Sequence, residues 1–275
     1  MEGSAAVAAV ELDPASTWTL VLFVGVVGLL VGSFLNVVIY RVPAGESVVR
    51  PRSRCMTCGH QITPAENIPV VSWLFLRGRC SGCGSRISAR YPLVELGTGI
   101  VFGVTAWWVG LSWTLPAFLY LAAIAVALSM IDLDVKRLPD AIVLPSYGVA
   151  LVLLGLAALL DGSWDQLLRG VLAGLALFAF YFVLVLVYPA GMGFGDVKLA
   201  GVLGLYLGWV SWGAVVIGTF SAFLFGAVVG IGVMVAGKGG RKAKIPFGPF
   251  MFLGTYFALA LAGPIVDWYV GTLGL

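Results

Sequence analysis

Long apolar segments, each close to the length of a membrane-crossing helix, constrain this chain more than any other feature of its sequence. A helix needs roughly 20 mostly apolar residues to cross the hydrocarbon core of a bilayer. Hydrophobic residues make up 60% of the chain and charged residues only 11%, against about 25% charged in typical soluble domains. The segments are continuous rather than alternating, which argues against a membrane β-barrel. We predict spans at about 18–40, 93–110, 114–131, 141–160, 167–187, 199–210, 212–236 and 249–270.

These segments predict an all-α polytopic membrane protein with about eight transmembrane helices. The span at 199–210 is the weakest prediction, because it is short enough to merge with the span that follows. The first span is not a cleaved signal peptide, since the residues before it include Glu2, Glu11 and Asp13 and no positive charge. The net charge of only +3 does not support a basic surface for nucleic acid. We therefore expect contacts with membrane lipid and none with nucleic acid.

The positions of lysine and arginine predict the orientation. If the N-terminus lies outside, fifteen of the sixteen basic residues fall on one face, and only Arg169 falls on the other. A bias of this kind marks the cytosolic side of a membrane protein. The loops predicted to be cytosolic are 41–92, 132–140, 188–198 and 237–248.

One of these loops, residues 41–92, is long enough to form a small domain. We expect it as an insertion between the N-terminal tail with the first helix, 1–40, and the remaining helices, 93–275. It holds all four cysteines, the single histidine and half of the basic residues of the chain. A segment of this size has too few core residues to fold without a further cross-link.

The cysteines have the spacing of two zinc-binding knuckles, with 21 residues between two CxxC pairs. Each CxxC turn places two thiolates on one metal ion, and two turns complete a tetrahedron. The alternative is two disulfides, which rarely persist in a reducing cytosol. Because four protein ligands leave no open position, we expect one structural Zn²⁺ per chain and a solvent-facing His60. The predicted ligands are Cys55, Cys58, Cys80 and Cys83.

Two acidic residues stand where predicted membrane helices meet cytosolic loops. Asp196 ends the string Gly-Met-Gly-Phe-Gly-Asp, whose glycines predict a non-helical turn that aims the acid into a cavity. Asp132 ends the third span, and Asp134 points to nearly the opposite side of a helix; Asp140 we take for an interfacial residue. Two such acids suit an aspartyl protease, whose carboxylates share one proton. A proton or cation pathway of a transporter uses the same groups, and the residues alone leave both open.

A series of motifs, in order from about residue 25 to residue 205, is similar to one known family. The motifs are Gly32–Arg41, Pro51–Cys55, Asn67–Leu74, Arg77–Cys80, Arg90–Glu95, Asp132 with Leu138–Asp140, and Gly193–Lys198. They resemble the bifunctional type IV prepilin peptidases, GxGD-type intramembrane aspartyl proteases that are also N-methyltransferases. Met56 departs from the pattern, because many relatives have Pro after the first cysteine.

The resemblance implies that Asp132 and Asp196 are the catalytic pair, since the family's first acid lies seven residues before the Pro of the LPD string. It implies a bacterial cytoplasmic (inner) membrane enzyme. The implied substrates are type IV prepilins or pseudopilins, whose short basic leader is cut at the cytosolic membrane boundary. The Cys-rich loop favours a second activity, N-methylation of the new N-terminus from S-adenosylmethionine.

Two residues are implied for the methyltransferase site, Gly78 and Glu95, and each has a structural alternative, a loop turn for the first and an interfacial acid for the second. The alternative for the whole chain is a proton-coupled transporter with a zinc-stabilised cytosolic loop. Such a transporter should show an internal inverted repeat, and none is evident along this sequence.

Overall fold

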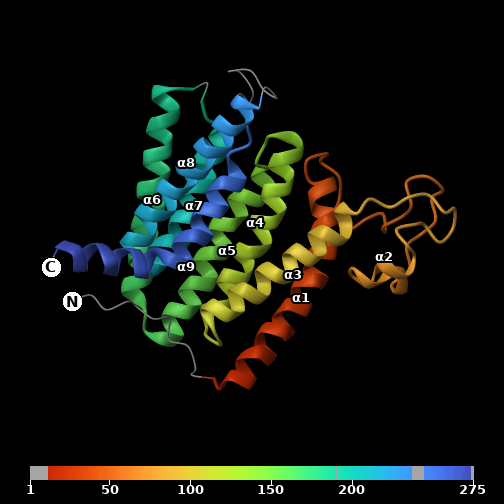
Figure 1. Cartoon of the computed structure of the whole chain (residues 1–275), viewed down its shortest axis with the longest axis horizontal. Helices are drawn as coiled ribbons and strands as arrows, with labels where there is room; N and C mark the ends of the chain where they lie inside the picture. Colours follow the sequence, from red (N-terminus) through yellow and green to blue (C-terminus); the bar gives the residue numbers. More distant parts are fainter. Residues whose placement is uncertain (1–11, 190, 237–244, 274–275) are drawn as a thin grey trace. The chain divides into compact units, whose positions relative to one another are not determined.

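The chain folds as long α-helices, in a computed structural model that describes residues 12–189, 191–236 and 245–273. Within these ranges no β-strand forms, and eight helices have 17 or more residues. The all-α prediction is therefore confirmed (Figure 1). The eight helices are α1 (Pro14–Arg41), α3 (Arg90–Val109), α4 (Leu115–Val135), α5 (Asp140–Asp161), α6 (Trp164–Val187), α7 (Phe194–Val210), α8 (Trp212–Val235) and α9 (Gly248–Leu273).

Among the described helices, seven are long and apolar enough to cross a membrane, and α7 is the one long helix that is not. Its 17 residues span roughly 25 Å, less than the roughly 30 Å of a bilayer core. Every residue from Leu199 to Trp209 is buried, because α5, α6, α8 and α9 all contact this helix. The weakest predicted span is thus a separate helix, and its apolar surface faces protein.

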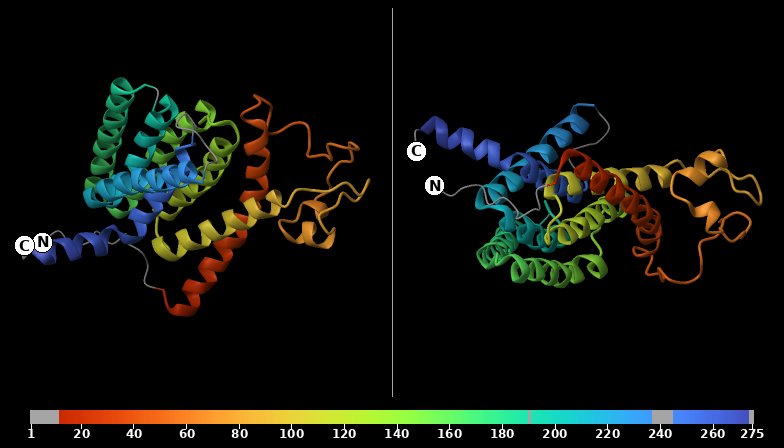
Figure 2. Two further views of the ribbon diagram at one scale, coloured as in Figure 1. Left: turned by 45° about the horizontal axis from the view of Figure 1, so that its top comes forward. Right: turned by 90° about the horizontal axis from the view of Figure 1, so that it is seen from below.

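The chain divides into two compact units. Of the described residues, the first unit, here called the α1/α3 unit, contains 12–111 and Phe118–Ala127. The second, the α5–α9 unit, contains Ser112–Ala117 and the described residues from Leu128 to 273. In the α1/α3 unit the two long helices pack side by side (Figure 2). The helix α2 (Val71–Phe75) and a 3₁₀ turn (Ala65–Asn67) lie in the segment between them.

In the α5–α9 unit, α6 and α7 approach so closely that their backbones touch. A Cβ atom at Gly204 of α7 would lie 2.6 Å from Cα of Gly174 and 2.7 Å from the carbonyl oxygen of Ala173 on α6. Small residues at such a crossing let dispersion forces act between backbones, which is how helices associate in lipid. No side chain larger than hydrogen fits at Gly204 without moving α6.

Arg169, the one basic residue predicted on the outer face, lies on α6 and caps the C-terminal end of α7. Its guanidinium donates hydrogen bonds to the carbonyl oxygens of Gly208, Trp209 and Val210, at 2.6, 2.7 and 3.0 Å. A cation at the C-terminal carbonyls of a helix offsets the partial negative charge there. A structural role therefore accounts for this exception to the charge bias.

Candidate active site and cysteine cluster

Asp132 lies in the last turn of α4, and its side chain is buried. The carboxylate accepts a hydrogen bond of 2.9 Å from the backbone N–H of Gly248. Gly248 is the first residue of α9, and the N–H groups of a first helical turn have no partner within the helix. The acid thus meets a free backbone donor that carries partial positive charge.

Asp196 lies in the first turn of α7 rather than in a loop. Its carboxylate accepts a hydrogen bond of 3.1 Å from the N–H of Gly193, the residue that precedes the helix. The predicted non-helical turn is present at Gly191–Gly193 but ends before Asp196, because α7 begins at Phe194. Gly193 has an ordinary extended backbone, and Gly191 and Gly195 have no positive φ, so the turn does not depend on the special conformations of glycine. At Gly195 a Cβ atom would lie 3.1 Å from that of Leu138, so the first turn of α7 packs closely against this leucine.

Leu138, in the short connection between α4 and α5, links the surroundings of the two acids. Its side chain contacts the backbone at Gly195 and also at Gly248, where a Cβ atom would lie 3.3 Å from the leucine and 2.9 Å from Asp132 Oδ2. The first turn of α7, which carries Asp196, and the first residue of α9, which binds Asp132, therefore both lie against this one leucine. The structure therefore brings these two predicted residues together. Asp134, by contrast, is exposed.

Lys198, two residues after the second acid, joins α7 to the start of α5. Its ammonium lies 2.8 Å from both carboxylate oxygens of Asp140 and 5.1 Å from the ring centre of Phe194. Tyr147 of α5 also donates a hydrogen bond of 2.6 Å to the carbonyl oxygen of Lys198. Asp140, predicted as an ordinary interfacial residue, is thus an ion-pair partner of the helix that carries Asp196.

Sequence reasoning missed Gly248 and Tyr181. Tyr181 of α6 is buried, and its ring centre lies 5.5 Å from that of Phe223 and 6.4 Å from that of Phe247, the residue before Gly248. For Gly248 a signal was present in the string Pro-Phe-Gly-Pro, because Pro is favoured in the first turn of a helix. Tyr181 carries no comparable signal within its apolar segment.

The four cysteines of the insertion lie together, as their spacing predicts. All four Sγ atoms are within 4.8 Å of one another, and two pairs, Cys55–Cys83 and Cys58–Cys80, are separated by 3.9 Å. A disulfide bond is about 2.05 Å long, whereas thiolates on a tetrahedral Zn²⁺ with Zn–S bonds of about 2.3 Å are about 3.8 Å apart. The cysteines are free thiols, and their arrangement fits a metal ion.

The two CxxC turns have the same backbone geometry. In the first, Gly59 has a φ of +74° and its N–H bonds to the carbonyl oxygen of Cys55 at 2.9 Å; in the second, Gly84 has a φ of +71° and bonds to Cys80 at 2.9 Å. Each turn closes with a bond from its first cysteine N–H, to His60 or to Ser85. The two CxxC sequences therefore fold into the same turn, which holds the two cysteines of each pair in the same arrangement.

His60 is not simply solvent-facing, because it joins the two turns. Its Nε2 lies 3.3 Å from Glu66 Oε1 and 3.2 Å from Ser81 Oγ. Ser81 donates a hydrogen bond to Glu66, as do the N–H and hydroxyl of Thr63. These bonds, that from Ser81 above all, lower the pKa of Glu66 to about 2, so the carboxylate stays ionised near neutral pH.

Gly78 and Glu95, the two residues implied for methyl transfer, both lie near α2. Gly78 is buried, has a φ of +64°, and ends the turn after α2. Glu95 is in the first turns of α3, where its Oε2 accepts a hydrogen bond of 2.7 Å from the N–H of Val70. Neither residue is an exposed interfacial group.

The fold and these sites define a multi-pass membrane protein with two neighbouring acids at helix ends and a four-thiolate cluster. Residues 26–109 match the bacterial peptidase A24 N-terminal domain, and residues 118–231 match the type IV leader peptidase family. No solved structure matches the chain. Three similar proteins are each named prepilin leader peptidase/N-methyltransferase. The one from Stutzerimonas stutzeri is 39% identical, and the match covers 95% of this chain and 97% of the relative. Those from Pseudomonas aeruginosa and Neisseria gonorrhoeae are 37% and 38% identical, with 90% and 89% of this chain and 92% and 93% of the relative covered. The chain belongs to the type IV leader peptidase family.

Proposed function

We propose that this protein cuts the basic leader from type IV prepilins or pseudopilins and methylates the N-terminus that cleavage creates. Membership of a leader peptidase family supports this function against the transporter alternative. The observation that carries it is the meeting of Asp132 and Asp196 from separate helix ends, each with a backbone N–H donor.

The two acids act as one unit. One carboxylate is ionised and takes a proton from water, while the other is protonated and polarises the carbonyl of the peptide bond. Gly248 and Gly193 each give one carboxylate oxygen a fixed partner, which leaves the other oxygen of each acid for water or substrate. Leu138 packs against Gly195 at one helix end and Gly248 at the other.

The orientation we propose has the N-terminus outside and the acids at the cytosolic face of the bacterial inner membrane. Lys198 lies at the same end of α7 as Asp196, and Arg169 caps the opposite end of this helix, in agreement with the charge bias. Four further basic residues of the bias lie outside the described residues: Lys238, Arg241, Lys242 and Lys244.

The insertion binds one structural Zn²⁺ through its four thiolates, because the Sγ separations suit a tetrahedral site with no open position. The methyl donor is S-adenosylmethionine, a sulfonium compound whose methyl group an amine can accept. Zinc has no part in either reaction in this proposal; it holds the two turns together.

The test is to incubate purified protein in detergent with a synthetic prepilin and S-adenosylmethionine, and to follow both products by mass spectrometry. We expect a peptide cut after the leader and a second product heavier by one methyl group. A peptide left intact by well-folded protein would overturn the peptidase, and a cut but unmethylated product would overturn the methyltransferase alone.

A further inference from the structure

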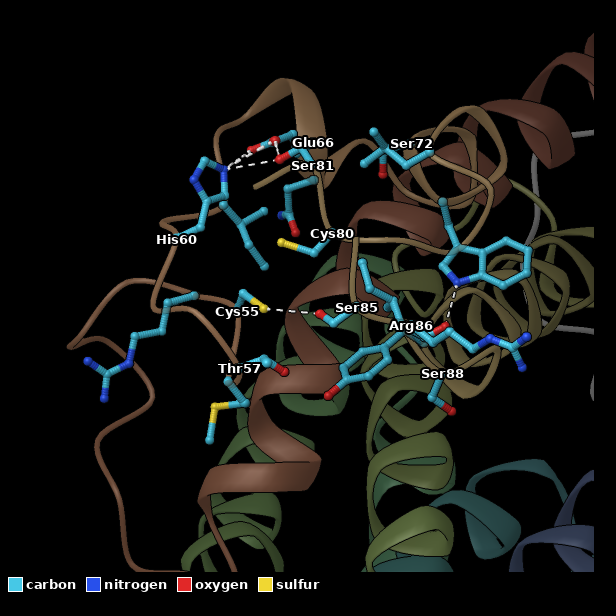
Figure 3. Close-up of a pocket in the computed structure, with 18 of the residues that line it drawn as sticks. Cys55, Thr57, His60, Glu66, Ser72, Cys80, Ser81, Ser85, Arg86 and Ser88 are labelled. Atoms are coloured by element: carbon cyan, nitrogen blue, oxygen red, sulfur yellow. Dashed lines mark hydrogen bonds and ion pairs between the residues drawn. The ribbon is translucent and has the colours of Figure 1, made fainter. Parts of the chain in front are cut away.

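A cavity of about 250 Å³ opens beside the cysteine cluster, within the α1/α3 unit. This volume is just below the range of roughly 300–1,000 Å³ for small-molecule sites. Figure 3 shows its polar side, where His60, Glu66 and Ser81 lie together and Arg86 lies beyond Ser85. The cavity is also lined by two aromatic residues, Trp73 and Tyr91, and by the carboxylate residue Glu95.

These side chains match the groups of one kind of ligand. A flat base stacks on aromatic rings such as Trp73 and Tyr91, and a sulfonium or ammonium is attracted by aromatic faces and carboxylates. Glu95 provides a carboxylate that retains acceptor sites beyond its bond from Val70, because a carboxylate has about four. Glu66 already accepts from His60, Ser81 and the N–H and hydroxyl of Thr63, so it adds negative charge to the polar side without a free acceptor site. Arg86 can pair with the carboxylate of an amino acid. S-adenosylmethionine carries all of these groups.

The backbone that holds Trp73 is anchored to the lining. Val70, directly before α2, has a φ of 61°, a conformation that is rare for a β-branched residue and persists only where its surroundings enforce it. Its N–H bonds to Glu95 at 2.7 Å, and the indole N–H of Trp73 donates to the carbonyl oxygen of Ile87 at 3.2 Å. Glu95 and Ile87 thus hold α2 and its ring in place.

Gly78 lies directly behind the same indole. A Cβ atom at this position would lie 2.8 Å from Cζ2 and 3.0 Å from Cε2 of Trp73. Any side chain there therefore pushes the ring, in addition to the strain of a φ of +64°. Gly78 controls the position of a lining residue without lining the cavity itself.

We infer that this cavity is the binding site for the methyl donor, with Trp73 and Tyr91 holding the base and Glu95 facing the cationic end. The inference rests on the proposed N-methyltransferase function and assigns that activity to the α1/α3 unit. It also explains how Gly78 and Glu95 belong to one site, Glu95 as part of the lining and Gly78 as a positioning residue.

The test measures binding of S-adenosylhomocysteine, the demethylated product, to the full-length protein by isothermal titration calorimetry in detergent. We expect Trp73→Ala and Gly78→Ala each to weaken binding about tenfold or more, the scale of losing a stacked base. The matched control is Gly45→Ala, in the turn after α1, which has the same left-handed strain at a φ of +70° but open space around its Cβ. This control should retain wild-type affinity, and all three variants should retain their zinc.

The outcomes separate this inference from the proposed function. If wild-type protein binds the compound and the Trp73 and Gly78 variants bind it equally well, the site is elsewhere while the methyltransferase stands. If wild-type protein shows no binding, the methyl donor itself is wrong. A measurement without variants uses ultraviolet crosslinking of labelled S-adenosylmethionine to wild-type protein, and label on peptides from 128–275 alone would also overturn the inference.

Discussion

Asp132 and Asp196 come from opposite kinds of helix end, the last turn of α4 and the first turn of α7. We expect Asp132→Asn and Asp196→Asn each to lower prepilin cleavage by roughly 10³-fold or more, because members of one catalytic unit fail together. The double variant should be no worse than either single one. The assay is cleavage of a synthetic prepilin by purified variants, and Asp134→Asn is the control because that residue is exposed. Near wild-type cleavage by either of the first two would contradict the pair.

Lys198 is a positioning residue for Asp196, because its ion pair with Asp140 holds the first turn of α7 against α5. We expect Lys198→Met to lower kcat by up to about fivefold with little change in KM, because a partly exposed ion pair contributes about 1 kcal/mol or less. Lys198→Arg should restore most of the rate. The control is Arg137→Met, an exposed cation of the nearby connection. Equal losses in both Met variants would point to general surface charge.

At the scale of elements, the crossing of α6 and α7 sets where the acid-bearing helix lies. Gly204→Ala places a methyl group against the backbone at Gly174 and Ala173, and such overpacking costs about 1–3 kcal/mol. Gly155→Ala is the matched helix variant, with nothing within 4 Å of its Cβ, and should be neutral or slightly stabilising. Thermal unfolding in detergent compares the two, and equal Tm values would show that the crossing tolerates a methyl group.

The helices were predictable from the sequence wherever a continuous apolar segment was long enough to cross a membrane. The predicted span 141–160 is α5 (Asp140–Asp161), and 212–236 is α8 (Trp212–Val235). The start of α7 was not predictable, because its first turn is glycine-rich and polar, the composition of a turn. The cysteine cluster was predictable because each knuckle is local. The bond from Gly248 to Asp132 joins positions 116 residues apart, a separation that pattern reasoning on one sequence does not reach.

At the scale of the whole molecule, we expect the proposed Zn²⁺ site to decide whether the insertion holds its fold. We expect about one zinc per chain, and Cys55→Ser or Cys80→Ser should remove most of it. Metal removal should speed tryptic cleavage at Arg54, Arg79 and Arg86, while peptides from the helices remain protected. The measurement is limited proteolysis with and without chelator. Titration that found no free thiols in native protein would contradict both the metal and the cytosolic location of this segment.

The bond between Gly248 and Asp132 has a consequence for biosynthesis. Asp196 meets its backbone partner three residues away, as soon as α7 has formed. The donor for Asp132 is the N–H of Gly248 at the beginning of the last helix, which is synthesised later. On the ribosome, therefore, a chain that has already inserted both acids still lacks the group that fixes the first of them. The proposed catalytic pair therefore reaches the geometry described here only after α9, the last helix, has been inserted.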